Sequence, residues 1–145
     1  MEYLHQDITE RIIQCFYEVY NTLGYGFLEK VYERAMLHEL TRSGLQVQGQ
    51  VPVTVHYKGE DVGDYFADIV VNDLVILELK AAEAVVEEHE LQLINYLKAT
   101  NMEIGLLLNF GRKPEVRRKI FTNDRKGIGQ RLHRSDRFLL PNQSV

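Results

Sequence analysis

The chain has 145 residues, of which 45% are hydrophobic, 26% are charged and only 3 are prolines, with a formal net charge of −4 at pH 7. This size and composition fit one folded domain and exclude a disordered or fibrous chain. No apolar run is long enough to span a membrane, no basic and apolar leader opens the chain, and the single Cys15 excludes an intrachain disulfide. We therefore expect a cytoplasmic protein.

The net charge hides an asymmetry along the chain. Between Arg112 and Arg137, ten Lys or Arg residues stand against three acidic residues, and the rest of the chain has an excess of acids. A basic segment could bind phosphates along a nucleic acid while the acidic remainder of the chain binds cations. The alternative is that the basic segment is a solvated polar tail. We expect a domain of residues 1–121 and a basic C-terminal extension of residues 122–145.

Helical periodicity dominates the first part of the sequence. Ile8 to Tyr20 predicts a first helix, Gly24-Tyr25-Gly26 interrupts it, and Leu28 to Arg42 predicts a second. From Leu45 to Tyr57 apolar and polar residues alternate as in a strand, and Lys58-Gly59 can turn the chain back into a further strand.

The second part alternates strands with one helix. Tyr65–Val71 and Leu74–Lys80 are β-rich, Glu87–Thr100 has helical spacing, and Ile104–Asn109 is typical of a buried strand. Val116–Phe121 can add an edge strand. The predicted order is ααββββαβ, an α+β fold in which a mixed sheet is flanked by helices.

Two acids and a lysine interrupt the apolar strands, at Asp68, Glu78 and Lys80. Because side chains alternate along a strand, Glu78 and Lys80 share one face and the leucines beside Glu78 share the other. Converging carboxylates suit a hard cation such as Mg²⁺, which can activate water at a phosphodiester, and a lysine can orient that water. An ordinary salt bridge between strands is the alternative, and this spacing alone favours it.

The register of one hairpin decides whether the two acids can act together. A two-residue turn at Asn72-Asp73 would pair Asp68 with Leu77 and place the carboxylates on opposite faces. A three-residue loop, or a bulge, would place Asp68 opposite Glu78. We predict the second register.

Polar side chains also recur on two of the helices. Glu29 and Tyr32 lie three residues apart and Gln92 and Tyr96 lie four apart, so each pair shares a helix face. Taken singly, such residues are more often a helix-dipole partner or a half-buried flank. We find no Ser/His/Asp triad, phosphate-binding glycine loop or zinc ligand set in the sequence.

The order and spacing of these polar residues resemble one known family. The residues concerned are Gly26-x-x-Glu29-x-x-Tyr32, Asp68, Glu78-x-Lys80 and Gln92-x-x-x-Tyr96. They resemble the GxxExxY family of the PD-(D/E)XK nuclease superfamily, near its RecB-like branch. The likeness runs from about Ile8 to Phe121, and Ala67 stands where the superfamily has its proline.

The resemblance implies a restriction-endonuclease-like fold and a metal site. Asp68 and Glu78 would be ligands of Mg²⁺ or Mn²⁺, Glu29 would complete the metal shell, and Lys80 would act on the attacking water. The reaction would be phosphodiester hydrolysis that leaves a 5′-phosphate, with DNA expected as substrate in preference to RNA.

The same resemblance assigns supporting residues. Gln92 and Tyr96 would lie beside the metal and touch the nucleic-acid backbone, and Tyr32 would bind nucleic acid or support the site. Two alternatives stay open: a non-catalytic nucleic-acid-binding or assembly module that keeps the nuclease fold, and a protein-interaction domain with a large exposed apolar patch. A homodimer is also left open.

Overall fold

The computed structural model describes residues 4–127, and no helix in that range is long and apolar enough to cross a membrane. The elements are α1 (Gln6–Leu23), α2 (Glu29–Arg42), β1 (Val47–Tyr57), β2 (Glu60–Val71), β3 (Val75–Lys80), α3 (Glu87–Lys98), β4 (Ile104–Phe110), β5 (Pro114–Ile120) and the 3₁₀ turn η1 (Asn123–Arg125). The predicted order ααββββαβ is therefore wrong by one strand, since residues 60–71 form a single long strand. The segment after Pro114 supplies the fifth strand.

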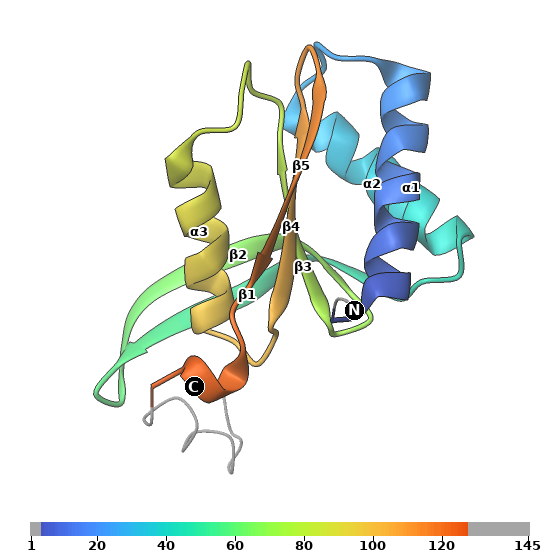
Figure 1. The fold of residues 1–145 in the computed structure, drawn as a ribbon. Helices are drawn as coiled ribbons and strands as arrows, with labels where there is room; N and C mark the ends of the chain where they lie inside the picture. The colour runs from blue at the N-terminus through green and yellow to red at the C-terminus, as the bar shows by residue number, and fades with distance from the viewer. Residues whose placement is uncertain (1–3, 128–145) are drawn as a thin grey trace.

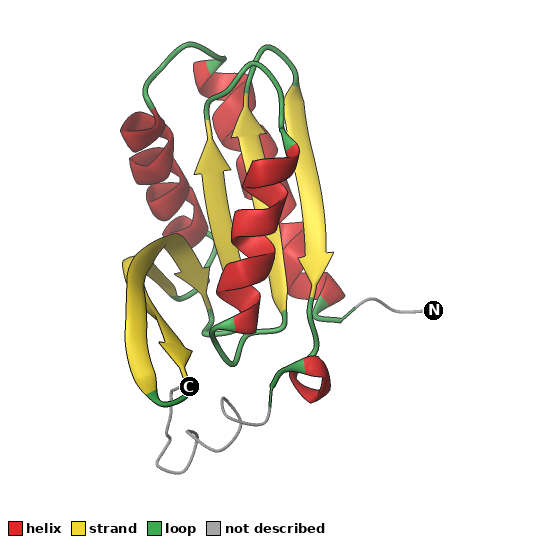
Figure 2. Ribbon diagram, turned by 90° about the vertical axis from the view of Figure 1, so that its left-hand side faces the viewer, coloured by secondary structure: helices red, strands yellow, loops and turns green. Residues whose placement is uncertain are grey.

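The five strands form one mixed sheet in the order β1-β2-β3-β4-β5. Only β3 and β4 run parallel among the described strands, because α3 carries the chain from the end of one to the start of the other. The predicted turn at Lys58-Gly59 joins β1 to β2 with φ angles of 51° and 88°, as a two-residue hairpin requires. Helices α1 and α2 cover one face of the sheet and α3 covers the other (Figures 1 and 2). The predicted fold class is confirmed.

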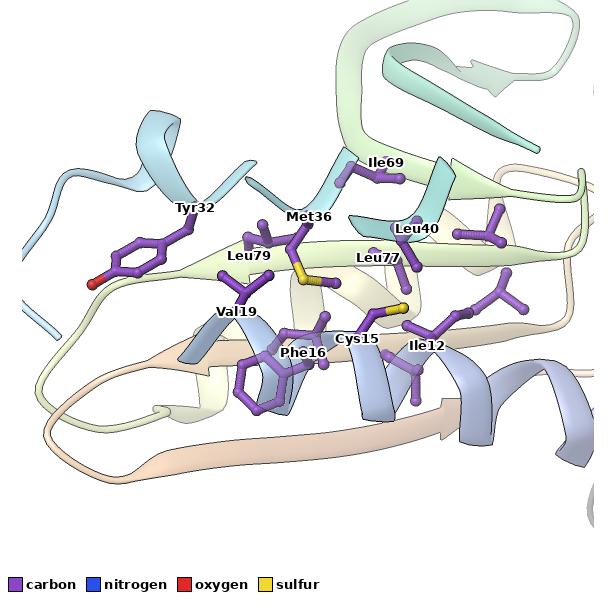
Figure 3. Close-up of a cluster of buried hydrophobic side chains, with 14 of the residues drawn as sticks. Ile12, Cys15, Phe16, Val19, Tyr32, Met36, Leu40, Ile69, Leu77 and Leu79 are labelled. Atoms are coloured by element: carbon purple, nitrogen blue, oxygen red, sulfur yellow. The ribbon is translucent and has the colours of Figure 1, made fainter. Parts of the chain in front are cut away.

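Two cores lie on the two faces of the sheet. The larger core joins α1 and α2 to the sheet, where Phe16 and Met36 meet Leu77 and neighbouring side chains (Figure 3). The smaller core lies under α3 and includes Ile76. Because β3 and β4 are covered on both faces, their sequences are nearly continuous apolar runs. A charged residue within β3 is therefore expensive and calls for a specific partner.

Strands β1 and β2 bend at a point nearer to their Val47 and Val71 ends than to the turn that joins them. Ile69 packs in the larger core, yet Ala67, two residues earlier, packs in the smaller one. The pairing of β1 with β2 is interrupted where Gln50 would face Asp68, and Gln50 has a left-handed φ of 51°. Such an irregularity bends a strand and re-aims its side chains. The outer part of the hairpin curves toward α3 (Figure 1), and Asp68 lies at the bend.

The first residues of the predicted C-terminal extension pack against the domain. Lys126 Nζ donates hydrogen bonds to the carbonyl oxygens of Thr100 (2.6 Å) and Met102 (2.9 Å), and the Asn123 backbone N–H donates to Glu103 Oε2 (2.7 Å). Burial lowers the pKa of Lys126 to about 8. The rest of the predicted extension, residues 128–145, lies outside the described residues, and its role stays a prediction.

Candidate active site

The hairpin between β2 and β3 has the predicted three-residue loop. Val71 pairs with Val75 and Ile69 with Leu77, which leaves residues 72–74 in the loop. The first two loop residues have φ angles of 53° and 54°, a left-handed conformation that Asn and Asp adopt more readily than most residues. Continued by one residue, this register places Asp68 opposite Glu78, as we predicted.

The two carboxylates take the place of the sheet hydrogen bonds at this point. The Asp68 backbone N–H donates to Glu78 Oε2 (3.0 Å), and the Leu79 backbone N–H donates to Asp68 Oδ2 (2.8 Å). Each carboxyl group is thus held by the backbone of the opposite strand. This exchange fixes both side chains on one side of the hairpin and opens the strand pair beyond Ile69.

Both carboxyl groups bind protons more tightly than usual. Glu78 is only 4% exposed, and burial, followed by the charge of Asp68, raises its pKa to about 8. Burial also raises the pKa of the half-buried Asp68, against the effect of its hydrogen bond from Leu79. Two neighbouring carboxylates removed from water are costly unless a cation offsets their charge.

Lys80 shares the strand face of Glu78 but forms no salt bridge with the pair. Its charge lowers the pKa of both Asp68 and Glu78, although by less than burial raises them. Among residues 4–127, no ion pair within 4.0 Å joins Lys80 to either carboxylate. The described residues therefore do not form the ordinary salt bridge between strands that was the alternative for Asp68, Glu78 and Lys80.

The chain just after Lys80 is anchored by a residue to which sequence reasoning assigned no role. Asn109 is fully buried on β4 beside Lys80. Its Oδ1 accepts the Ala82 backbone N–H (2.9 Å) and its Nδ2 donates to the Ala82 carbonyl oxygen (3.0 Å). A Cβ at Gly111 would lie 2.4 Å from that same oxygen, so only glycine fits there. Together they fix the end of β3, on which Lys80 stands.

Helix α2 brings two more acids toward the pair, one of which sequence reasoning missed. Glu29 is exposed in the first helical turn, while Glu33, one turn later, is 8% exposed. Both charges raise the pKa of Asp68, and Glu33 has the larger effect. Glu33 Oε2 accepts a hydrogen bond from Gln50 Nε2 (2.9 Å), which ties it to the bend in β1. The four-residue spacing from Glu29 is a signal that could have found Glu33.

The predicted three-carboxylate ligand set is not assembled in the described residues. Within residues 4–127, no group of three or more His, Cys, Asp or Glu side chains is placed to hold a metal ion. Asp68 and Glu78 are brought together, and Glu29 acts on them at longer range through its charge. Its role as a third ligand therefore stays a proposal.

Tyr32 supports the loop that leads into α2. Its ring is fully buried and stacks on Phe110 with centroids 4.2 Å apart. Its hydroxyl donates to the Gly24 carbonyl oxygen (2.6 Å) and accepts the Phe27 backbone N–H (3.2 Å). These contacts fix the start of α2, where Glu29 lies, and leave no ring surface for a ligand.

Gln92 and Tyr96 lie on the face of α3 that meets the sheet. Gln92 Nε2 donates to the Tyr96 hydroxyl (3.2 Å), as their four-residue spacing allows. Tyr96 is 5% exposed and packs in the core that contains Ile76. Burial, followed by the charges of Glu78 and Asp68, raises the pKa of Tyr96 to about 12. The charges of both carboxylates thus reach the Tyr96 hydroxyl, and the predicted position of Gln92 and Tyr96 beside the metal stays a proposal.

Comparison with known proteins agrees with this arrangement. The sequence profile described as the PD-(D/E)XK nuclease superfamily matches residues 6–119, well over half of the chain. The chain belongs to the PD-(D/E)XK nuclease superfamily. The members of this superfamily are generally nucleases, which are hydrolases.

One solved structure has a fold similar to that of the chain. The crystal structure of SSO0001 is similar, with a TM-score of 0.52 and 14% identity, over 64% of this chain and 50% of that chain. At this identity the likeness concerns the fold alone, and the match spans half the length of SSO0001. No curated protein sequence matches the chain.

The residues that carry the resemblance to the superfamily motif lie on the bent hairpin. In that resemblance Asp68 corresponds to the first acid, and Glu78 and Lys80 correspond to the (D/E)-x-K part. Ala67, fully buried, stands where the PD-(D/E)XK motif has its proline. Proline contributes no chemistry to the site, so this departure leaves the polar part of the motif whole.

Proposed function

We propose that this chain is a metal-dependent nuclease of the GxxExxY family, near the RecB-like branch, and that it hydrolyses phosphodiester bonds in nucleic acid. Asp68 and Glu78 hold Mg²⁺ or Mn²⁺, and Lys80 assists the attacking water. DNA is the expected substrate in preference to RNA. One observation carries the proposal: the two carboxylates face each other at a bend, and both have raised pKa values. Within residues 4–127, no Lys, Arg or His side chain forms an ion pair with either of them.

The donor set fits a hard divalent cation. Mg²⁺ and Mn²⁺ take oxygen ligands, and one or two carboxylates with several waters is the usual form of a Mg²⁺ site that binds phosphate. The cation's charge would offset the cost of burying Asp68 and Glu78 side by side. Glu29 and Glu33 of α2 supply the acids from which a third carboxylate can come.

The remaining residues have separate tasks in this proposal. Asp68 and Glu78 would hold a divalent cation, which would lower the pKa of a bound water molecule and offset the negative charge that develops on the phosphodiester. Lys80, held in place at the end of β3, orients the attacking water and stabilises negative charge in the transition state. Gln92 and Tyr96 contact the nucleic-acid backbone and position it against the carboxylates. Hydrolysis would leave a 5′-phosphate on the product.

Cleavage of a panel of labelled substrates tests the proposal. We expect the purified chain to cut at least one of single- and double-stranded DNA and RNA in Mg²⁺ or Mn²⁺, and to cut none in EDTA. Restored cutting after excess metal is added back would show that EDTA acts through the cation.

Two other outcomes of the panel are informative. Binding of nucleic acid without cleavage in either metal would contradict catalysis and favour the non-catalytic module that keeps the nuclease fold. A chain that neither binds nor cuts nucleic acid would contradict the nuclease and the non-catalytic nucleic-acid-binding module alike. The protein-interaction domain would then be the remaining alternative.

A further inference from the structure

A groove of about 510 Å³ lies between α3 and the outer part of the β1–β2 hairpin. Its walls come from β1, β2 and α3, and they are mostly apolar and aromatic side chains. The outer part of the β1–β2 hairpin curves toward α3 (Figure 1), and residues of both strands and of α3 line the groove. Concave apolar sites of this volume with a few polar groups are typical of ligand-binding pockets.

Two exposed side chains face the groove from opposite walls. Tyr65 of β2 is 48% exposed, and its ring centroid lies 5.9 Å from that of Tyr96 at an angle of 45°. Leu91 of α3 is also 48% exposed and lines the other wall. An exposed aromatic ring beside an apolar wall offers a planar, uncharged group a surface on which to stack.

The groove shares two side chains with the proposed nucleic-acid site. Gln92 and Tyr96, which we propose to contact the nucleic-acid backbone, both line it. A backbone held by these two side chains would bring one of its bases to the groove.

The polar groups of the groove suit the edge of a nucleobase. Asn95 supplies an amide that both donates and accepts hydrogen bonds, and Gln92 lies one turn before it. Glu88 and Lys98 supply one negative and one positive charge. Amides match the mixed donor and acceptor edge of a base, and a lysine can contact an adjacent phosphate.

We propose that the groove binds one unpaired nucleobase of the substrate, stacked on Tyr65, and that the chain therefore prefers single-stranded or overhanging nucleic acid to continuous duplex. This inference rests on the proposed function. A base inside a duplex is already stacked and hydrogen-bonded, so it reaches the groove only at the cost of leaving the helix. A base in a single strand reaches it without that cost.

Tyr65→Ala is the variant that tests this inference. We expect its affinity for a fluorescent single-stranded oligonucleotide, measured by anisotropy in EDTA, to be about 10-fold lower, the size expected when one aromatic stacking partner is lost. Its affinity for a blunt duplex of the same sequence is expected to stay within about twofold of the wild-type value. With Mn²⁺, the ratio of kcat/KM for single strand over duplex is expected to fall by the same factor.

The neighbouring residue provides a matched control. Phe66 is 55% exposed on the same strand and, by strand alternation, points away from the groove, so Phe66→Ala removes a similar ring without touching it. Tyr65→Phe keeps the stacking ring and should bind as the wild type does. Thermal unfolding of each variant shows whether the fold is retained.

The possible failures can be told apart. Equal single-strand binding by Tyr65→Ala, Phe66→Ala and wild type would overturn the groove assignment, while metal-dependent cleavage by the wild type would leave the nuclease proposal standing. A wild-type chain that neither binds nor cuts any nucleic acid would overturn the nuclease proposal and the groove assignment with it.

Discussion

Asp68→Asn is expected to lower the single-turnover rate of metal-dependent cleavage by about 1,000-fold or more. Loss of the carboxylate weakens binding of the cation, whose charge stabilises the transition state by several kcal/mol. Asparagine keeps a side-chain oxygen that can accept the Leu79 backbone N–H, so the fold should be retained. Rates on a labelled substrate in Mg²⁺, with circular dichroism of the variant, give the measurement. Lys80→Ala is expected to change the rate in the same direction.

The same hairpin supplies a control with the same chemical change. Asp73 is exposed in the loop with a left-handed φ of 54°, a conformation that asparagine tolerates well. Asp73→Asn should therefore cut at the wild-type rate. An Asp68→Asn protein that cuts within about tenfold of wild type would show that Asp68 is not a ligand of the catalytic metal.

The metal-free protein is expected to lose stability as the pH rises. Because the pKa of Glu78 in the folded chain is raised to about 8, the folded chain keeps a proton that the unfolded chain has already released at lower pH. The free energy of unfolding therefore falls between the ordinary glutamate pKa and about 8, and the raised pKa of Asp68 acts in the same direction. At about 1.4 kcal/mol per pKa unit, the melting temperature in EDTA should fall by roughly 10 °C between about pH 5.5 and pH 8.5.

Glu78→Gln separates this effect from the titration of other groups. Glutamine keeps an oxygen that can accept the Asp68 backbone N–H but cannot ionise, so the melting temperature of the variant should depend less on pH. At about pH 8.5, Mn²⁺ should raise the melting temperature of wild type and leave that of the variant nearly unchanged. The same pH slope in both proteins would exclude Glu78 as its source.

Local periodicity was enough to predict most of the fold. The helices before Arg42, the helix that begins at Glu87 and the buried strand from Ile104 are all present, because each pattern reports the face that must be buried. The error concerned residues 60–71, which form one strand. In that segment the chain passes from exposed to buried surroundings, so the alternation changes although the strand does not end.

The hairpin register was the part of the site that the sequence could specify. A loop of residues 72–74, one of the two connections that bring Asp68 opposite Glu78, is the one that the structure has. The left-handed Gln50 could not be predicted, because no local pattern marks a bend that two strands share. The spacing from Glu29 could have pointed to Glu33, but the hydrogen bond of Glu33 to Gln50 depends on that bend and could not be predicted.

Calorimetric titration of the purified chain with Mn²⁺ at about pH 7.5 tests most directly whether Asp68 and Glu78 form a divalent cation site. We expect saturable binding by wild type that is lost in both Asp68→Asn and Glu78→Gln and kept in Asp73→Asn. Wild-type protein that binds no Mn²⁺, or variants that bind it as tightly as wild type does, would contradict the proposed cation site.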